Sequence, residues 1–347
     1  MPADVDRHPG HGRDGGRRAH LRYALRDTTA GCEAPRPPVT PDNAVTLPAA
    51  SFDAAECWPP LPLAEWLDTC ATLHMWSQIV GKVRLALTPL VNHWWNVPLY
   101  VYPRGLTTSA IPYGGGAFEL RFDFLRHELV LDASFARPRS MPLAARSVAD
   151  FYAESMAMLG AAGIDVAIRT LPVEVPDPIP FEQDRVHASY DRASVERFFR
   201  VLQSVDRVLH NFRRGFVGKC SPVHFFWGSF DLAVSRFSGR VAPPRADADA
   251  ITREAYSHEV SSVGFWPGEG FADAAFYAYM APEPAGYRGQ APRPSTAYYD
   301  AKLGEFILMY DDVRRAASPS AVLLEFCEST YAAGADLAGW DRARLDR

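Results

Sequence analysis

Histidines that lie in aromatic-rich segments are the residues of this sequence best suited to chemistry. A histidine titrates near pH ~6.5, so it can transfer a proton or, when neutral, bind a metal ion. Burying such a polar ring is costly unless the ring is hydrogen-bonded or used. Each ring could equally be a hydrogen-bonded core residue. Five of the ten histidines belong to this group: His74, His93, His210, His224 and His258.

Two kinds of chemistry fit these residues. A divalent metal ion needs three or four ligands that converge from separate segments, whereas proton transfer or hydrolysis needs fewer groups. No pair of candidates has the His-x-x-x-His or His-Glu-x-x-His spacing that identifies a zinc site from sequence. Burial would raise the pKa of Glu259, and an adjacent histidine or lysine would lower it again. The same four residues are the candidates for catalysis and for metal binding: His93, His224, His258 and Glu259.

Basic and aromatic side chains are the candidates for holding a substrate. The arginines could orient an anionic group, and the lysines could clamp an anion or act as Schiff-base lysines if desolvated. A lysine directly after a glycine is also typical of a helix end, where its charge suits the helix dipole. The tryptophans could stack on a planar ligand. The candidate substrate-binding residues are Arg104, Arg236, Lys82, Lys219, Trp95 and Trp266.

Three short motifs are weaker signals. Gly114-Gly-Gly116 precedes a predicted strand, so it is typical of a hairpin turn and not of a phosphate loop. Gly228-Ser-Phe-Asp231 lacks the strand–elbow–helix setting of a hydrolase nucleophile. Phe265-Trp-Pro-Gly268 could cover a pocket as an aromatic lid, although Pro-Gly first of all favours a turn.

Composition limits the classes of protein to which the chain can belong. The 347 residues carry 36 Lys and Arg against 41 Asp and Glu, a net charge of −5, which disfavours a nucleic-acid binder. No apolar run approaches the ~20 residues that span a bilayer. The five cysteines are odd in number and form no C-x-x-C motif, which favours a reducing compartment. We therefore expect a cytoplasmic protein whose partner is a small molecule, with no nucleic acid and no membrane.

Four segments are expected along the chain. Residues 1–55 are polar and contain a proline-rich run, so they cannot bury enough apolar area to offset the entropy of ordering, and we expect a disordered tail. Residues 56–171 form a first half. Residues 172–190 are rich in proline and form an extended connection, and residues 191–347 form a second half.

Hydrophobic periodicity predicts similar elements in both halves. The first helix is expected to end at Gly81, and His93 is expected in a strand, on the same side as Trp95. The fold class is therefore α+β, with two similar α-β-β-β-α halves whose mainly antiparallel sheets are covered by helices. The main predicted elements are helix 63–80, strand 118–124, helix 148–159, helix 194–212 and strands near 223–237, 259–265 and 275–280.

Matching residues suggest that the halves arose by duplication. The first half has His74, then Gly81-Lys82, then His93-Trp-Trp95, and the second repeats this order. The match requires gaps, and the alternative is two unrelated helix-to-strand transitions. If the duplication is real, the halves face each other and a ligand pocket lies between them. The second-half counterparts are His210, Gly218-Lys219 and His224-Phe-Phe226.

Several long runs make the chain resemble a bacterial family catalogued only as a domain of unknown function, number 5996. The resemblance covers roughly Trp58 to Asp341 and leaves the preceding tail outside. It implies no reaction, no cofactor and no catalytic residue. The runs are Thr72-Leu-His-Met-Trp76, Val91-Asn-His-Trp-Trp95, Arg104-Gly-Leu-Thr-Thr108, His224-Phe-Phe-Trp-Gly-Ser-Phe230 and Ser257-His-Glu-Val-Ser-Ser262.

Titratable residues inside aromatic runs lead us to expect a small-molecule enzyme of acid–base or hydrolytic type, with or without a metal ion. The alternative is a non-catalytic small-molecule-binding protein, a sensor or carrier, that uses the same pocket. A carboxylate and a histidine at hydrogen-bond distance around a cavity would favour the enzyme. A pocket of aromatic residues with one arginine would favour the sensor. A structural protein would instead show a large exposed apolar face.

Overall fold

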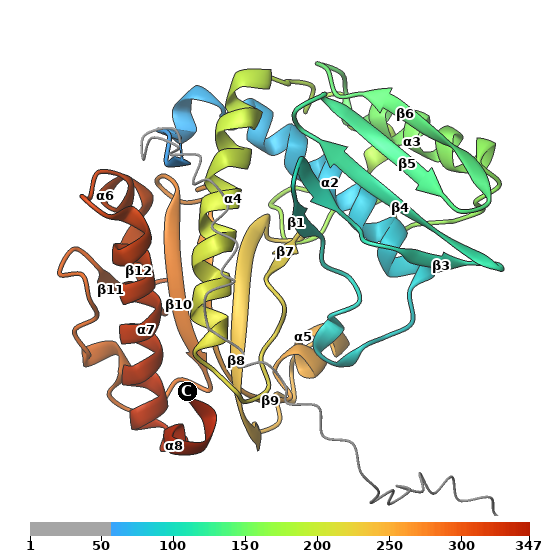
Figure 1. Cartoon of the computed structure of the whole chain (residues 1–347). Helices are drawn as coiled ribbons and strands as arrows, with labels where there is room; N and C mark the ends of the chain where they lie inside the picture. Colours follow the sequence, from blue (N-terminus) through green and yellow to red (C-terminus); the bar gives the residue numbers. More distant parts are fainter. Residues whose placement is uncertain (1–56) are drawn as a thin grey trace, which may run out of the picture. The chain divides into compact units, whose positions relative to one another are not determined.

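Two antiparallel six-stranded sheets form the framework of the fold (Figure 1). The structure is a computed structural model and describes residues 57–347. The α+β class with two similar halves is confirmed, but each half has six strands where the sequence pattern indicated three. The predicted disordered tail, residues 1–55, lies outside the described residues.

In the amino-acid sequence, the strands of the first sheet come after one long helix and before another. Its strands pair in the order β1-β2-β4-β5-β6, and β3 pairs with β4. The alternation predicted for 118–124 is confirmed, because Phe118, Leu120 and Phe122 are buried on one side of β4. The elements are η1 (Leu63–Glu65), α2 (Leu67–Leu87), η2 (Asn92–Trp94), β1 (Tyr100–Tyr102), β2 (Gly105–Thr107), β3 (Ile111–Tyr113), β4 (Gly116–Asp123), β5 (Glu128–Ala133), β6 (Ala136–Pro142) and α3 (Val148–Ala161).

Helix α2 does not end at Gly81, as the sequence predicted, but continues to Leu87. A Cβ atom at position 81 would lie 2.3 Å from the ring of Trp227. The glycine is therefore present so that a tryptophan of the second half can pack against the helix, and not to stop it. Trp227 is held there by a hydrogen bond of 2.9 Å from its Nε1 to the carbonyl of Val97.

The strands of the second sheet pair in the order β11-β12-β10-β9-β8-β7, so β7 to β10 are consecutive neighbours and β12 lies between β10 and β11. Helix α4 precedes it and begins after Asp191, whose side chain accepts a hydrogen bond of 2.8 Å from the amide of Ser194. The elements are η3 (Phe181–Gln183), α4 (Arg192–Arg214), β7 (His224–Phe226), β8 (Asp231–Val241), α5 (Ala250–Ala255), β9 (His258–Trp266), β10 (Ala275–Ala281), η4 (Tyr287–Gly289), β11 (Tyr298–Asp300), β12 (Glu305–Met309), α6 (Tyr310–Arg314), α7 (Pro319–Leu337) and α8 (Arg342–Leu345).

The two faces of the second sheet differ in character. Helices α4 and α7 cover one face, onto which alternate residues of the central strands point, such as Leu232, Phe265 and Phe276 (Figure 1). The strand registers place a different set on the opposite face, which we call the polar face. It carries His224, Phe226, Asp231, Ala233, Ser235, Phe237, Ser262, Gly264, Tyr277, Tyr279 and Glu305.

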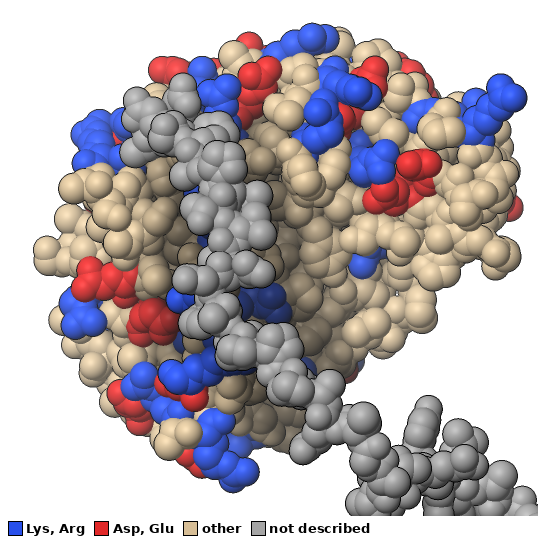
Figure 2. Space-filling view, in the orientation of Figure 1, with Lys and Arg blue, Asp and Glu red and all other residues tan. Residues whose placement is uncertain are grey.

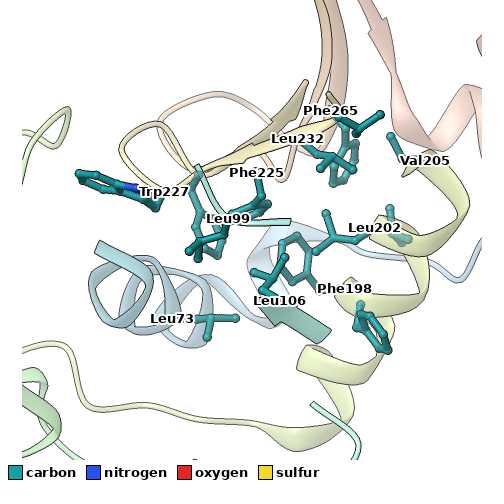
Figure 3. Packing of buried hydrophobic residues seen from close by; sticks show 14 of the residues in the cluster. Leu73, Leu99, Leu106, Phe198, Leu202, Val205, Phe225, Trp227, Leu232 and Phe265 are labelled. Atoms are coloured by element: carbon teal, nitrogen blue, oxygen red, sulfur yellow. The ribbon is translucent and has the colours of Figure 1, made fainter. Parts of the chain in front are cut away.

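One hydrophobic core joins the two halves (Figure 3). Leu73 and Leu106 of the first half belong to the same buried cluster as Phe198 and Leu232 of the second. Leu99 and Phe225 also exchange two backbone hydrogen bonds, of 2.9 and 2.8 Å, so the edges of the two sheets are linked. Residues 57–347 accordingly belong to one compact unit.

Of the residue pairs that suggested a duplication, His74 and His210 both lie on helices, α2 and α4, but the other two pairs occupy different elements. Lys82 lies inside helix α2, whereas Lys219 follows helix α4 and runs beside strand β8. His93 lies in the turn η2, whereas His224 begins strand β7. These two pairs therefore do not support a duplication, which stays a hypothesis.

Charged side chains are mixed on the face that carries α4 and α7. Figure 2 shows Lys and Arg there interspersed with Asp and Glu, with no single broad basic patch on that view of the described residues. None of the described helices combines the length and the apolar character needed to cross a membrane.

Candidate functional site

Three of the five aromatic-run histidines gather around Trp95. The ring centroids of His93 and His258 are 5.5 Å apart, and Trp95 lies 5.4 Å from His93 and 6.0 Å from His224. The other two histidines lie elsewhere. His74 donates from Nε2 to the carbonyl of Gly228 at 2.8 Å and contacts Glu269 at 3.1 Å, and His210 is exposed on α4.

His93 lies in a strained turn and not in the strand that the sequence predicted. His93 and Trp94 have φ values of 57° and 59°, a region that costs a residue with a side chain of order 1–3 kcal/mol. The turn is held by the last residues of α5, since the amide of His93 donates to the carboxylate of Glu254 at 3.1 Å. Nδ1 of His93 lies 3.1 Å from the carbonyls of both Glu254 and Ala255, so this nitrogen carries the proton.

The other ring nitrogen of His93 therefore accepts a hydrogen bond from Lys219. The distance from Nζ of Lys219 to Nε2 of His93 is 2.6 Å. The ammonium group also lies 5.3 Å from the ring centroids of both Trp95 and Phe237. Burial lowers the pKa of Lys219, and Glu254 opposes this effect. Among the described residues, no carboxylate lies within 4.0 Å of the Lys219 ammonium.

His224 is buried, and its ring centroid lies 6.0 Å from that of Trp95. Neither of its ring nitrogens has a hydrogen-bond partner among the described residues. Burial lowers the pKa of His224 to about 3, and the charges of Arg84 and Arg213 contribute. The ring is therefore neutral at pH 7 and cannot serve as a cation.

The remaining predicted catalytic residue, Glu259, is not part of this group. It follows His258 directly in β9, so the two side chains point to opposite sides of the strand. The carboxylate of Glu259 pairs with Arg240 at 2.6 Å and accepts a hydrogen bond of 3.0 Å from Ser238. In the described part of the chain, no three His, Cys, Asp or Glu side chains are arranged to hold a metal ion. The metal-ligand set predicted from the sequence is therefore not assembled.

Two predicted basic anchors have structural roles inside the protein. The ammonium group of Lys82 donates to the carbonyls of Arg169 and Leu171 at 3.1 and 2.5 Å. The guanidinium group of Arg236 is buried 3.4 Å from the ring centroid of Phe212 and pairs with Glu328 at 3.3 Å. Neither charge is available to a ligand on the polar face.

The other two predicted contacts lie apart from the histidine group. Arg104 pairs with Asp123 at 2.5 Å in the first sheet. Trp266 stacks on Phe271 with ring centroids 5.6 Å apart. Of the predicted substrate-binding residues, only Lys219 and Trp95 contact the gathered histidines.

The structure also reveals a carboxyl group that the sequence reasoning missed. Asp231, only 6% exposed, lies on the polar face and accepts hydrogen bonds from Ser229, at 2.5 Å, and from the hydroxyl of Tyr277. Burial raises the pKa of Asp231 to about 6, although the two hydrogen bonds oppose the shift. Asp231 belongs to the motif Gly228-Ser-Phe-Asp231. In that motif the sequence pattern suggested the serine, and not the aspartate, as the candidate for chemistry.

Two more carboxyl groups with raised pKa surround Asp231. Burial raises the pKa of Glu305 to about 7, and the neighbouring charges of Asp231 and Asp300 add to the shift. Burial also raises the pKa of Glu174, although its side chain keeps contact with solvent. The three carboxyl groups come from strands β8 and β12 and from the connection between the halves, so only the tertiary fold brings them together.

Tyrosines cover the middle of the polar face. The hydroxyls of Tyr256 and Tyr279 are 3.0 Å apart, and Tyr277 and Tyr279 stack with ring centroids 6.1 Å apart. All three side chains are partly exposed. The polar face therefore has acidic groups and His224 near the start of β8, tyrosines in the middle, and Lys219 with His93 near the end of β8.

A cavity of about 290 Å³ lies elsewhere, between residues 60–62 and helix α6. Its polar groups already have partners within the protein. Asp273 accepts a hydrogen bond of 2.9 Å from the amide of Leu63, and Arg314 pairs with Asp311 at 2.5 Å. This cavity therefore offers no free acid or base.

Comparison with known proteins relates the chain to a family without a described activity. The model of a family of unknown function, DUF5996, matches residues 58–347. No curated protein and no solved structure matches the chain.

Proposed function

This chain belongs to the DUF5996 family, of unknown function, and from its own geometry we propose a small-molecule enzyme of acid–base or hydrolytic type centred on Asp231. The proposal places the reaction on the polar face of the second sheet. A substrate would lie over the tyrosines between the acidic and the basic ends of this face.

The observation that carries the proposal is the state of the Asp231 carboxyl. A group with a pKa of about 6 exchanges its proton readily near neutral pH, which suits a general acid or base. The hydrogen bonds from Ser229 and Tyr277 fix both carboxyl oxygens in place. A buried, oriented carboxyl of this kind is typical of catalytic sites.

Glu305 supplies a second titrating group on the same face. Burial raises its pKa to about 7, close to that of Asp231, so both carboxyl groups can exchange a proton near neutral pH. Asp231 can then accept a proton from the substrate or from an attacking water. Glu305 can donate a proton to the atom that leaves. The proposal uses no metal ion, because the candidate ligands are not assembled.

A non-catalytic sensor or carrier is the second candidate function. The observation that favours it is the aromatic wall beside Lys219, in which the adjacent rings of Trp95 and Phe237 both contact a cation. Such a site can retain an aromatic or anionic ligand without any reaction. The two functions differ in whether Asp231 is needed for a chemical change.

We also propose that the protein acts in the cytoplasm. Four cysteines lie within the described residues, and none of them forms a disulfide there. Free thiols of this kind suit a reducing compartment.

A screen for chemical change distinguishes an enzyme from a sensor. The full chain would be incubated in D₂O with a library of carboxylic acids, esters, amides and phosphate esters, and masses would be recorded. An acid–base enzyme exchanges hydrogen for deuterium or adds water to at least one compound. Asp231→Asn should slow that change by about 10²–10⁴-fold. Glu259→Gln is the matched control, because Glu259 pairs with Arg240 away from Asp231.

Two results would contradict the proposal. The first is binding of library compounds, seen as saturable stabilisation, with no change in mass of any of them. That result supports the sensor. The second is a reaction that Asp231→Asn leaves at the wild-type rate.

A further inference from the structure

We propose that Lys219 anchors the oxyanion group, a carboxylate or a phosphate, of an elongated substrate that lies along the polar face. The proposal deepens the proposed function by naming the class of substrate. It rests on that function only in treating the bound anion as part of a substrate.

The first support is the charge of Lys219. Its ammonium group has three N–H donors, and its single hydrogen-bond partner in the described part of the chain is His93. No carboxylate within 4.0 Å neutralises it among those residues. Glu254 acts on the lysine from beyond that distance. A partly buried cation with no carboxylate in direct contact keeps the capacity to pair with an anion.

The second support is the way in which the lysine is held. His93 is fixed as an acceptor toward Lys219, because its other nitrogen donates to the carbonyls of Glu254 and Ala255. The turn that carries His93 has two residues at positive φ. Strain of this kind persists only where the surrounding structure enforces it, and it is common at ligand sites. The strained turn keeps the ammonium group in one position before any ligand arrives.

The third support is the wall around the charge. The adjacent rings of Trp95 and Phe237, whose centroids are 5.8 Å apart, form one wall beside the ammonium group, and both belong to a small apolar cluster with Tyr256 and Tyr279. Trp95 keeps part of its surface exposed. The aromatic rings reduce the access of water to the charge, and this strengthens its attraction to an oxyanion. They also give the part of the ligand next to the oxyanion a flat surface.

The length of the ligand follows from the register of β8. Lys219 lies beside Phe237, whose amide donates to the Lys219 carbonyl at 2.9 Å. Asp231 lies six residues before Phe237 on this strand, so the backbones of these two residues are roughly 20 Å apart at ~3.3 Å per residue. A molecule whose oxyanion contacts Lys219 must therefore extend along the polar face if it is to react at Asp231.

The scarcity of lysine permits a direct test in the unmodified protein. The chain has only three lysines, Lys82, Lys219 and Lys302, so protein labelled with ¹³C-lysine gives three assignable side-chain signals. Phenyl phosphate and benzoate would be titrated separately at constant ionic strength, with chloride as the reference anion. We expect a saturable shift of the Lys219 signal, and constant signals from Lys82 and Lys302. If neither phenyl phosphate nor benzoate produces a saturable shift of the Lys219 signal, the proposal is wrong.

Substitutions provide the second arm of the test. Lys219→Met should weaken the binding of the better probe at least tenfold, and Lys219→Arg should restore part of the loss. Lys302→Met, in the turn between β11 and β12, is the matched control and should bind as the wild type does. Each variant is checked for cooperative unfolding. Equal binding by folded Lys219→Met and wild type contradicts the proposal.

The same titration separates this proposal from the proposed function. Asp231→Asn should bind phenyl phosphate as the wild type does, because Asp231 lies at the other end of the face. A Lys219-dependent signal without any Asp231-dependent reaction removes the enzyme and leaves the anion anchor. An Asp231-dependent reaction without anion binding at Lys219 removes only the anchor.

Discussion

The hydroxyl of Tyr277 reaches across strand β9 to donate a hydrogen bond to the buried carboxylate of Asp231. The two residues belong to β10 and β8, which are not neighbours in the sheet. The tyrosine passes directly over Gly264, where a Cβ atom would lie 2.4 Å from the Tyr277 hydroxyl oxygen. One glycine therefore makes room for the contact that orients the proposed acid–base group.

Gly264→Ala should disrupt this contact. The added methyl group collides with both the hydroxyl and the ring of Tyr277, so the tyrosine must move or the strands must separate. We expect a loss of about 1–3 kcal/mol in the free energy of unfolding, measured by urea denaturation. Gly160→Ala is the control, since no atom lies within 4 Å of a Cβ placed there in α3. An equally stable Gly264→Ala protein would show that Tyr277 is not confined over position 264.

The stability of the protein should depend on pH through Asp231. In the folded chain its carboxyl holds a proton up to about pH 6, whereas an unfolded aspartate releases it near ~3.9. The stabilisation by this proton is therefore complete below pH ~3.9 and is lost as the pH rises through 6. About two pKa units correspond to roughly 3 kcal/mol. Asp231→Asn should consequently gain on the order of 2–3 kcal/mol relative to wild type between pH 4 and pH 7.

Urea unfolding of both proteins at several pH values measures this difference. Asp231→Asn also removes the charge that acts on Glu305, so the comparison measures the titration of Asp231 together with its effect on Glu305. A difference that stays constant from pH 4 to pH 7 would mean that the carboxyl titrates at an ordinary pH in the folded protein.

Removal of the tyrosine hydroxyl should shift the titration of Asp231 upward. The hydrogen bond from Tyr277 favours the ionised carboxylate, and burial acts in the opposite direction. Tyr277→Phe leaves the burial and removes the donor, so the pKa of Asp231 should rise above about 6. The ¹³C signal of the Asp231 carboxyl, followed by NMR against pH, measures it. Ser262→Ala is a nearby control on the same face, and it should leave the Asp231 midpoint in place. An unchanged midpoint in Tyr277→Phe would refute a direct effect of the hydroxyl.

Lys82→Met should destabilise the protein, whereas Lys302→Met should not. Lys82→Met removes the donor for the carbonyls of Arg169 and Leu171, so we expect a loss of about 1–3 kcal/mol in unfolding free energy. Lys302→Met, at the surface, should stay within about 0.5 kcal/mol of wild type. Chemical denaturation of the three proteins provides the comparison. If Lys82→Met proved as stable as Lys302→Met, the hydrogen bonds from Lys82 to the two carbonyls would not stabilise the fold.

The helices and strands with a clear period could be predicted from the sequence. The alternation of Phe118 to Phe122, the apolar stripe of α4 and its cap Asp191 depend on residues close in the chain. A helix repeats every 3.6 residues and a strand every 2 residues, so the spacing of residues in the chain decides which side chains share a face. These elements were sufficient for the α+β class and for the two halves.

The site depended on residues far apart in the chain. Gly81 continues a helix because Trp227 packs there, and His93 leaves the extended conformation because Lys219 and α5 hold it in a turn. Neither partner is near in sequence. Local pattern therefore predicted the wrong conformation at both positions.

The sequence alone determined that polar, titratable side chains would lie among aromatic residues in both halves. Only the tertiary structure decided which of these side chains contact one another in a site. The register of β8, β9 and β10 brings Tyr277 to Asp231, and burial by distant segments shifts the pKa of that carboxyl. Burial and register are properties of the assembled sheet, so the pairing of these two residues could not be read from their spacing in the chain.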